Sequence, residues 1–116
     1  DRLDKIASLM PNYPIVLHGA SSVVPEFVAM ANEFGGDIAG AKGVPEDLLR
    51  KAASKAVCKI NIDTDIRLAM TGVIRKFLAE NPTEFDPRGY LGASRGAVKE
   101  MVRHKIINVL GCSNTV

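Results

Sequence analysis

Two apolar runs in this sequence end in small polar residues of the kind that bind anions. The runs are residues 15–17 (IVL) and 57–62 (VCKINI), and the residues that follow them are His18, Gly19, Ala20 and Ser21 after the first, and Asp63 and Thr64 after the second. Glycine lets a ligand approach the backbone, and the N–H groups that open a helix form an anion cradle. A plain turn or helix cap explains either motif alone equally well. Two such motifs in consecutive strand–helix units favour one shared phosphate site.

His18 follows the first apolar run directly, at the rim of the sheet where a metal ion or a substrate would lie. The alternative, which this residue alone favours, is a histidine hydrogen-bonded within a loop. A catalytic zinc site usually takes three protein ligands. The other histidine, His104, lies in a charged segment (residues 103–105) that we expect to face solvent. We therefore do not expect this chain to close a zinc site by itself.

Strand alternation divides the side chains of the second run between two faces. One face carries Lys59, Asn61 and Asp63, and the other carries Cys58, Ile60 and Ile62. We expect the polar face to line the interior of a barrel, where Asn61 and Asp63 would bind a polyhydroxylated substrate. Lys59 would lie deeper, either ion-paired in the barrel floor or, as the alternative, acting as a Schiff-base nucleophile. Cys58 is expected to pack as a small core residue.

These residues must be positioned by alternating helices and strands. Apolar spacing and helix-breaking residues predict helices over residues 1–10, 25–34, 45–56, 66–78 and 98–110, and strands over 15–17 and 57–62. Residues 37–43 and 85–88 are expected to be connectors. Short, wholly apolar strands joined by long crossovers are typical of a parallel sheet. The predicted fold class is α/β.

The two C-terminal helices carry the apolar stripes that we expect to be buried. The stripe residues are Ile66, Ala69, Met70, Val73, Ile74, Phe77 and Leu78 in the first of these helices, and Val98, Met101, Val102, Ile106 and Leu110 in the second.

Composition excludes several classes of protein. The 116 residues include 15 basic and 13 acidic side chains, a net charge of +2, with 47% hydrophobic and 24% charged residues. This charge, without basic runs, argues against a nucleic-acid partner, and neither a membrane span nor a signal peptide is recognisable. Two cysteines, Cys58 and Cys112, fit a reducing, cytoplasmic compartment. Because the sequence starts at Asp1 rather than Met, we expect its start to be interior to a longer product.

Three segments carry longer motifs. They are residues 14–22 (PIVLHGASS), 57–67 (VCKINIDTDIR) and 85–92 (FDPRGYLG). Together they resemble the class II, metal-dependent fructose-1,6-bisphosphate aldolases, and the similarity extends from about residue 1 to residue 111. The resemblance implies a (β/α)₈ TIM barrel. Residues 1–116 would be the C-terminal portion of that single barrel domain, supplying the last two β/α units and the C-terminal helices.

The resemblance implies roles for the residues of the first motif. His18 matches one of the three histidines that bind the catalytic Zn²⁺ in this family. Gly19, Ala20 and Ser21 match the loop that binds the phosphate of dihydroxyacetone phosphate, against which a monovalent cation (Na⁺ or K⁺) lies.

The second motif supplies the remaining implied contacts. Asn61 matches a residue bonded to the triose backbone, and Ile62 lies within the same binding segment. Asp63 and Thr64 match contacts to substrate hydroxyl and phosphate groups. An aspartate at this position favours fructose bisphosphate over tagatose bisphosphate. Arg67 matches an arginine that reaches the distal phosphate across a dimer interface.

The departures from the family pattern set the expected activity of the chain. The catalytic base, an aspartate followed by a zinc histidine, lies in the family on an earlier strand that this sequence does not contain, and so does the remaining zinc histidine. A complete barrel takes about 250 residues. We expect a zinc-dependent aldolase, a homodimer or homotetramer when complete, and no activity from these 116 residues alone. The alternatives are a non-catalytic phosphate-binding or folding fragment, a tagatose-bisphosphate aldolase, and another phosphosugar barrel enzyme that uses Lys59.

Overall fold

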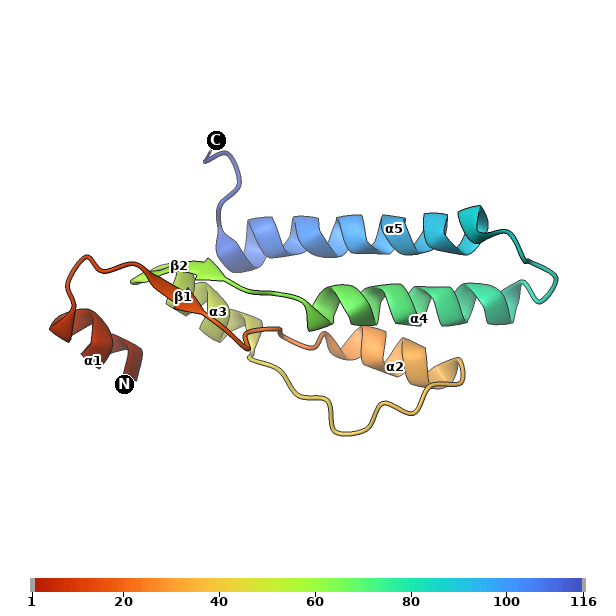
Figure 1. Ribbon diagram of the computed structural model, residues 1–116, viewed down its shortest axis with the longest axis horizontal. Helices are drawn as coiled ribbons and strands as arrows, with labels where there is room; N and C mark the ends of the chain where they lie inside the picture. The colour runs from red at the N-terminus through yellow and green to blue at the C-terminus, as the bar shows by residue number, and fades with distance from the viewer. Residues whose placement is uncertain (1, 116) are drawn as a thin grey trace.

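Two short β-branched runs form a parallel pair of strands at one end of the molecule (Figure 1). The computed structural model describes residues 2–115. Strand β1 (Ile15–Leu17) pairs with β2 (Val57–Ile60), with Ile15 opposite Val57 and Leu17 opposite Ile60. The predicted parallel arrangement is confirmed. Strand β2 ends two residues earlier than predicted, because β1 ends at Leu17, whose carbonyl accepts the last ladder hydrogen bond, from the Asn61 N–H (3.0 Å).

The crossover between the strands contains two helices. Helix α2 (Pro25–Glu33) begins at a proline and α3 (Glu46–Ala53) begins directly after one, so a fixed φ helps to start each of them. Helix α1 (Arg2–Leu9) precedes β1 and has no buried residue. These helices match the predicted segments closely, although Asp1, which the first prediction included, lies outside the described residues. The mixed helix-and-strand content agrees with the predicted α/β class.

Two long helices form the other end of the molecule (Figure 1). Helix α4 (Thr64–Glu80) lies between α2 and α5 (Pro87–His104), and a π-helix, η1 (Lys105–Leu110), continues from α5 and packs against α3. The predicted connector at residues 85–88 was right for residues 85 and 86 and wrong for residues 87 and 88. Helix α5 starts at Pro87, where the Asp86 carboxylate accepts a hydrogen bond from the Arg88 N–H (2.9 Å). Glycines in this segment hid the helical pattern from a count of apolar residues.

The predicted apolar stripes of α4 and α5 were also partly wrong. The buried residues of α4 are Asp65, Leu68, Ala69 and Gly72, and those of α5 and η1 are Ser94, Met101, Lys105 and Val109. Among the stripe residues, Met70 and Leu78 are each 38% exposed, and Val102 and Ile106 are each 37% exposed. Helix α4 packs against α2 and α5, and the face that these contacts bury is rotated from the predicted stripe.

One small hydrophobic cluster lies beside the strands. Ala20, Leu49 and Val109 form its centre, with Leu17, Val44 and Ile60 partly buried against it. Leu17 at the end of β1 and Ala20 in the loop after it pack against Leu49 of α3 and Val109 of η1. This packing positions the strand ends. Within residues 2–115, no helix is both long and apolar enough to cross a membrane.

Candidate functional site

The carboxyl ends of both strands open onto one cavity of about 550 Å³. Its lining residues are Gly19, Ala20, Ser21, Ile60, Asn61, Ile62, Asp63 and Thr64. The structure thus brings together the polar residues that follow the two apolar runs, although they are more than 40 positions apart in the sequence. Gly19 adopts a φ of +61°, in the left-handed region that glycine occupies without strain. The chain turns sharply there, directly after His18.

Ser21 joins the two strand ends. Its hydroxyl oxygen accepts hydrogen bonds from the backbone N–H groups of Asp63 (3.2 Å) and Thr64 (3.1 Å). These amides open α4, where the helix dipole favours negative charge. Ser21 therefore fixes the loop after β1 to the first turn of α4, beside the cavity.

His18 lies against Asn61, the last residue held by the strand ladder. The Asn61 Nδ2 atom is 3.0 Å from His18 Nδ1 and 3.3 Å from Nε2. His18 is exposed, so its imidazole could serve as one ligand of a metal ion. Across the described part of the chain, however, no three side chains of the ligating types gather around a common point. These residues therefore do not form a complete zinc site.

Asp63 is paired with Arg67 one turn along α4. The Arg67 Nε donates to both carboxylate oxygens, at 3.0 and 2.9 Å, and both side chains are largely exposed. Asp63 occupies the N-cap position of α4 but makes no side-chain capping hydrogen bond. Its carboxylate instead faces solvent beside the cavity, where the pairing holds the Arg67 guanidinium near the same opening.

A buried carboxylate, Asp65, lies behind the strand ends. The residue is fully buried, and its two oxygens accept hydrogen bonds from the Ser22 N–H (2.9 Å), the Ser22 hydroxyl (3.1 Å) and the Val23 N–H (2.6 Å). The Lys105 ammonium lies 3.1 Å from the same carboxylate. Burial raises the pKa of Asp65, but the hydrogen bonds from Ser22, Lys105 and Val23 outweigh it and hold the pKa below its usual value.

Lys105 connects this carboxylate to a second one. Its Nζ also contacts Glu46 at the start of α3 and donates to the Ser22 hydroxyl (2.6 Å). Glu46 is further bonded to His104 Nε2 (2.7 Å). Burial raises the pKa of Glu46, whereas the hydrogen bonds from Lys105 and His104 lower it by more, so the net shift is downward. We call Ser22, Glu46, Asp65 and Lys105 the buried polar cluster.

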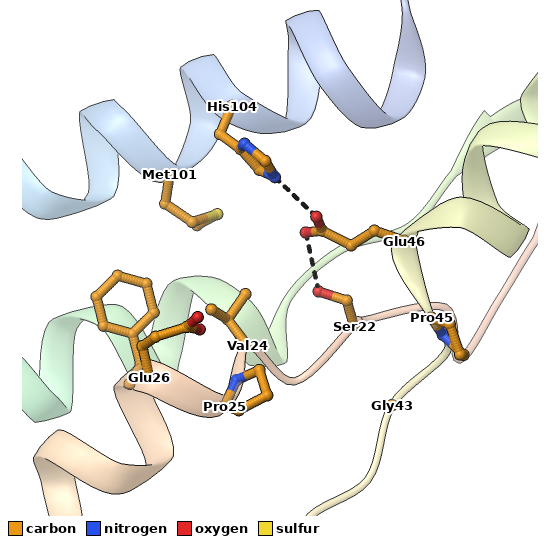
Figure 2. Close-up of a pocket in the computed structure, with 10 residues that line it drawn as sticks. Ser22, Val24, Pro25, Glu26, Gly43, Pro45, Glu46, Met101 and His104 are labelled. Atoms are coloured by element: carbon orange, nitrogen blue, oxygen red, sulfur yellow. Dashed lines mark hydrogen bonds and ion pairs between the residues drawn. The ribbon is translucent and has the colours of Figure 1, made fainter.

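A second cavity, of about 670 Å³, opens beside this cluster (Figure 2). Figure 2 shows His104 and Ser22 both directed at the Glu46 carboxylate, with Met101 and Val24 forming apolar parts of the wall. None of the residues expected to bind substrate lines this second cavity. The strand-end cavity is therefore the candidate site, although it is the smaller of the two.

Comparison with known families decides the relationship. The family described as fructose-bisphosphate aldolase class-II matches residues 1–115. The chain belongs to the class II fructose-bisphosphate aldolase family.

Individual relatives agree with this assignment. The chain is 51% identical over 111 residues to the fructose-bisphosphate aldolase of Treponema pallidum, covering 96% of this chain and 33% of that protein. It is 50% identical over 105 residues to the enzyme of the same name from Thermus caldophilus (90% and 34%), and 47% identical over 106 residues to that of Giardia intestinalis (91% and 32%). The chain spans about a third of the length of these curated relatives.

Two side chains of the second strand lie in surroundings that differ from the expected ones. Lys59 and Cys58 in the two-stranded sheet are exposed rather than buried. His104 is exposed, as expected, and it is also hydrogen-bonded to Glu46.

The sequence analysis missed the buried polar cluster. Lys105 was assigned to a solvent-facing charged segment, yet only 3% of it is exposed. Asp65 was seen only as part of the motif of residues 57–67, and Glu46 only as part of the predicted helix of residues 45–56. One signal was available: Lys105 follows the buried Met101 by four residues, so both lie on one helical face.

Proposed function

We propose that this chain is the C-terminal part of a class II fructose-1,6-bisphosphate aldolase. The complete enzyme would cleave fructose 1,6-bisphosphate reversibly to dihydroxyacetone phosphate and glyceraldehyde 3-phosphate. One observation carries the proposal: in a chain of this family, two strand ends that are distant in sequence converge on one polar cavity. Ligand sites in (β/α)₈ barrels lie at this end of the strands, and the last two strands often share a phosphate site. The rest of the barrel would come from outside these 116 residues.

His18 would supply one ligand to Zn²⁺, and the remaining ligands and the catalytic base would come from the rest of the barrel. When bound, zinc polarises the substrate carbonyl and stabilises the negative charge that develops beside it. The exposure of His18 at the end of β1 supports this role, because the imidazole can be reached by ligands from other strands. A monovalent cation, Na⁺ or K⁺, is proposed next to the loop of Gly19 and Ser21.

The substrate would lie across both strand ends. Gly19, Ala20 and Ser21 would bind the phosphate of the triose, because the loop offers backbone N–H groups to an anion. The residues proposed to complete the binding set are Asn61, on the triose backbone, and Ile62, Asp63 and Thr64, on its hydroxyl and phosphate groups. Arg67 would reach the distal phosphate of a substrate bound to a partner subunit. Its exposure supports a role toward a second copy, in a homodimer or homotetramer in the cytoplasm.

The test is metal-dependent cleavage by the complete enzyme that contains this chain. We expect cleavage of fructose 1,6-bisphosphate that a chelator abolishes and added Zn²⁺ restores. Cleavage that survives the chelator but is trapped by borohydride would favour a Lys59 Schiff base instead. Faster turnover of tagatose 1,6-bisphosphate would reassign the substrate. If neither sugar is cleaved, the non-catalytic alternatives and a barrel enzyme for another phosphosugar remain.

A further inference from the structure

The loop after β1 is fixed to the first turn of α4 by five hydrogen bonds. Two of them end on the Ser21 hydroxyl and come from the amides of residues 63 and 64. The other three run from Ser22 and Val23 to the Asp65 carboxylate. Together, the two sets of hydrogen bonds involve residues 21–23 of the loop and residues 63–65 at the start of α4. The Ser21 hydroxyl faces the candidate site, while Asp65 is buried behind it.

Val23 shows that this turn needs support. Its φ is +54°, in the left-handed region that a β-branched residue rarely adopts. Such a backbone persists only where its surroundings hold it. The short hydrogen bond from the Val23 N–H to Asp65 Oδ1 (2.6 Å) provides that hold. The conformation of residues 21–23 thus depends on a carboxylate that does not line the candidate site.

Lys105 holds that carboxylate in turn. It lies 83 positions beyond Ser22, in the C-terminal π-helix, and its ammonium reaches Asp65, Glu46 and the Ser22 hydroxyl together. The Lys105 side chain is 4% exposed, so these partners satisfy its charge in place of water. A buried cation and two carboxylates therefore meet directly behind the loop.

We propose that Asp65 and Lys105 are positioning residues for the phosphate-binding loop. Their ion pair holds the turn of residues 21–23, and through it the Ser21 hydroxyl and the backbone N–H groups that face the substrate phosphate. This inference rests on the proposed function, because it takes the loop after β1 as the phosphate site. It adds that the C-terminal π-helix, which contributes nothing to the wall of the strand-end cavity, sets phosphate affinity.

A purely structural role predicts a different outcome from a positioning role. Loss of a structural contact lowers the fraction of folded enzyme, which reduces the apparent kcat and leaves the KM of the folded molecules unchanged. Loss of positioning weakens phosphate binding in molecules that remain folded and retain zinc. The split between KM and kcat therefore separates the two roles.

The experiment uses the complete enzyme with the substitution Lys105→Met, which removes the charge and keeps an unbranched side chain. Inorganic phosphate is the probe, measured as a competitive inhibitor of fructose 1,6-bisphosphate cleavage. We expect the inhibition constant for phosphate and the KM to rise about tenfold or more, because small misplacements of binding groups have large effects. The zinc content and kcat should change less than about twofold. Lys99→Met, at an exposed position on α5, is the matched control and should leave all four values unchanged.

A second variant keeps the test decisive if Lys105→Met does not fold. Ser22→Ala removes the hydroxyl shared by Lys105 and Asp65 but leaves the backbone N–H that donates to Asp65. Like Lys105→Met, it should raise the inhibition constant for phosphate. An unchanged inhibition constant in a folded, zinc-loaded Ser22→Ala enzyme overturns the positioning role. Wild-type enzyme without zinc-dependent cleavage would instead refute the proposed function, a result that the same assay gives before any variant is made.

Discussion

A substitution at His18 tests metal binding separately from substrate binding. Among the described residues, His18 is the one that we propose as a zinc ligand, and it lies at the end of β1 against Asn61. In the complete enzyme, His18→Ala removes one of three proposed protein ligands. We expect zinc content to fall by at least about tenfold and cleavage to be lost with it. Metal analysis of the purified variant provides the measurement, and tight stoichiometric zinc with full turnover would refute the assignment.

Asp63 is expected to act on the substrate rather than on the metal. Its carboxylate is exposed at the cavity and paired with Arg67. Asp63→Ala in the complete enzyme should raise the KM for fructose 1,6-bisphosphate about tenfold or more while zinc content stays at the wild-type level. Steady-state kinetics with parallel metal analysis test this, and Asp37→Ala, at an exposed position in the crossover loop, is the control. A loss of zinc with unchanged KM would move Asp63 to the metal site.

Asp65 and Glu46 give the fold a defined sensitivity to acid. Both pKa values are lowered in the folded state, from ordinary values of 3.8 and 4.5. A lowered pKa contributes stability that is fully present above the unfolded value and is lost as the pH falls through the folded value. We expect the thermal midpoint of the metal-free enzyme to decrease as the pH falls below about 4.5. The decrease should be less steep in Asp65→Asn. Calorimetry from pH 6 to pH 3 tests this, and parallel curves for the two proteins would contradict it.

At the scale of elements, the crossover loop is held against the loop after β1 by backbone contact. Gly43 lies so close that an added Cβ would be 2.3–2.4 Å from backbone atoms of Ser21 and Ser22. Gly43→Ala must therefore displace the loop, at a cost of about 1–3 kcal/mol of stability. Gly96→Ala in α5 is the matched control, because its Cβ would meet nothing within 4 Å. A helical alanine there should stabilise the enzyme by about 0.5–1 kcal/mol.

Unfolding in denaturant distinguishes these two glycine variants. Opposite shifts of the midpoint, downward for Gly43→Ala and upward for Gly96→Ala, are the expected result. Equal shifts of the two variants would mean that the crossover loop moves away without cost. In that case the loop of residues 21–23 would be held by its hydrogen bonds to the first turn of α4 rather than by the crossover loop.

The same scale explains how much could be predicted from the sequence. The strand ends were predictable, because apolar runs followed by glycine and serine depend on local chemistry. The start of α5 at Pro87 was not, since packing against α4 stabilises a glycine-rich helix that has little periodicity of its own. Lys105 was missed for a related reason. A stripe defined by apolar residues cannot show that a cation is buried by partners that lie 40 or more positions earlier.

At the scale of the whole molecule, the chain is too extended for a domain of its length. Its radius of gyration is 17.1 Å, with extents of 59 × 34 × 17 Å, whereas a compact domain of this length has a radius of about 13 Å. Its accessible surface is 7909 Å², against about 6200 Å² for a folded monomer of this mass. Part of the excess is apolar: Leu9, Tyr13 and Val16 are 72%, 58% and 43% exposed at the strand end of the molecule (Figure 1). These surfaces fit contacts with the rest of a barrel.

This shape predicts how the 116 residues behave on their own. The two-stranded sheet has open edges and exposed apolar side chains, so the isolated chain should bind a hydrophobic dye and unfold with low cooperativity. It should show no aldol cleavage even with added Zn²⁺, because the described residues gather only one proposed ligand. Adding the remaining barrel segment as a separate chain should reduce dye binding and restore cleavage together, since one interface would cover the strands and complete the metal site. Cleavage by the purified 116-residue chain alone would refute this prediction. Dye binding lost without recovered cleavage would show that the barrel can close without assembling its site.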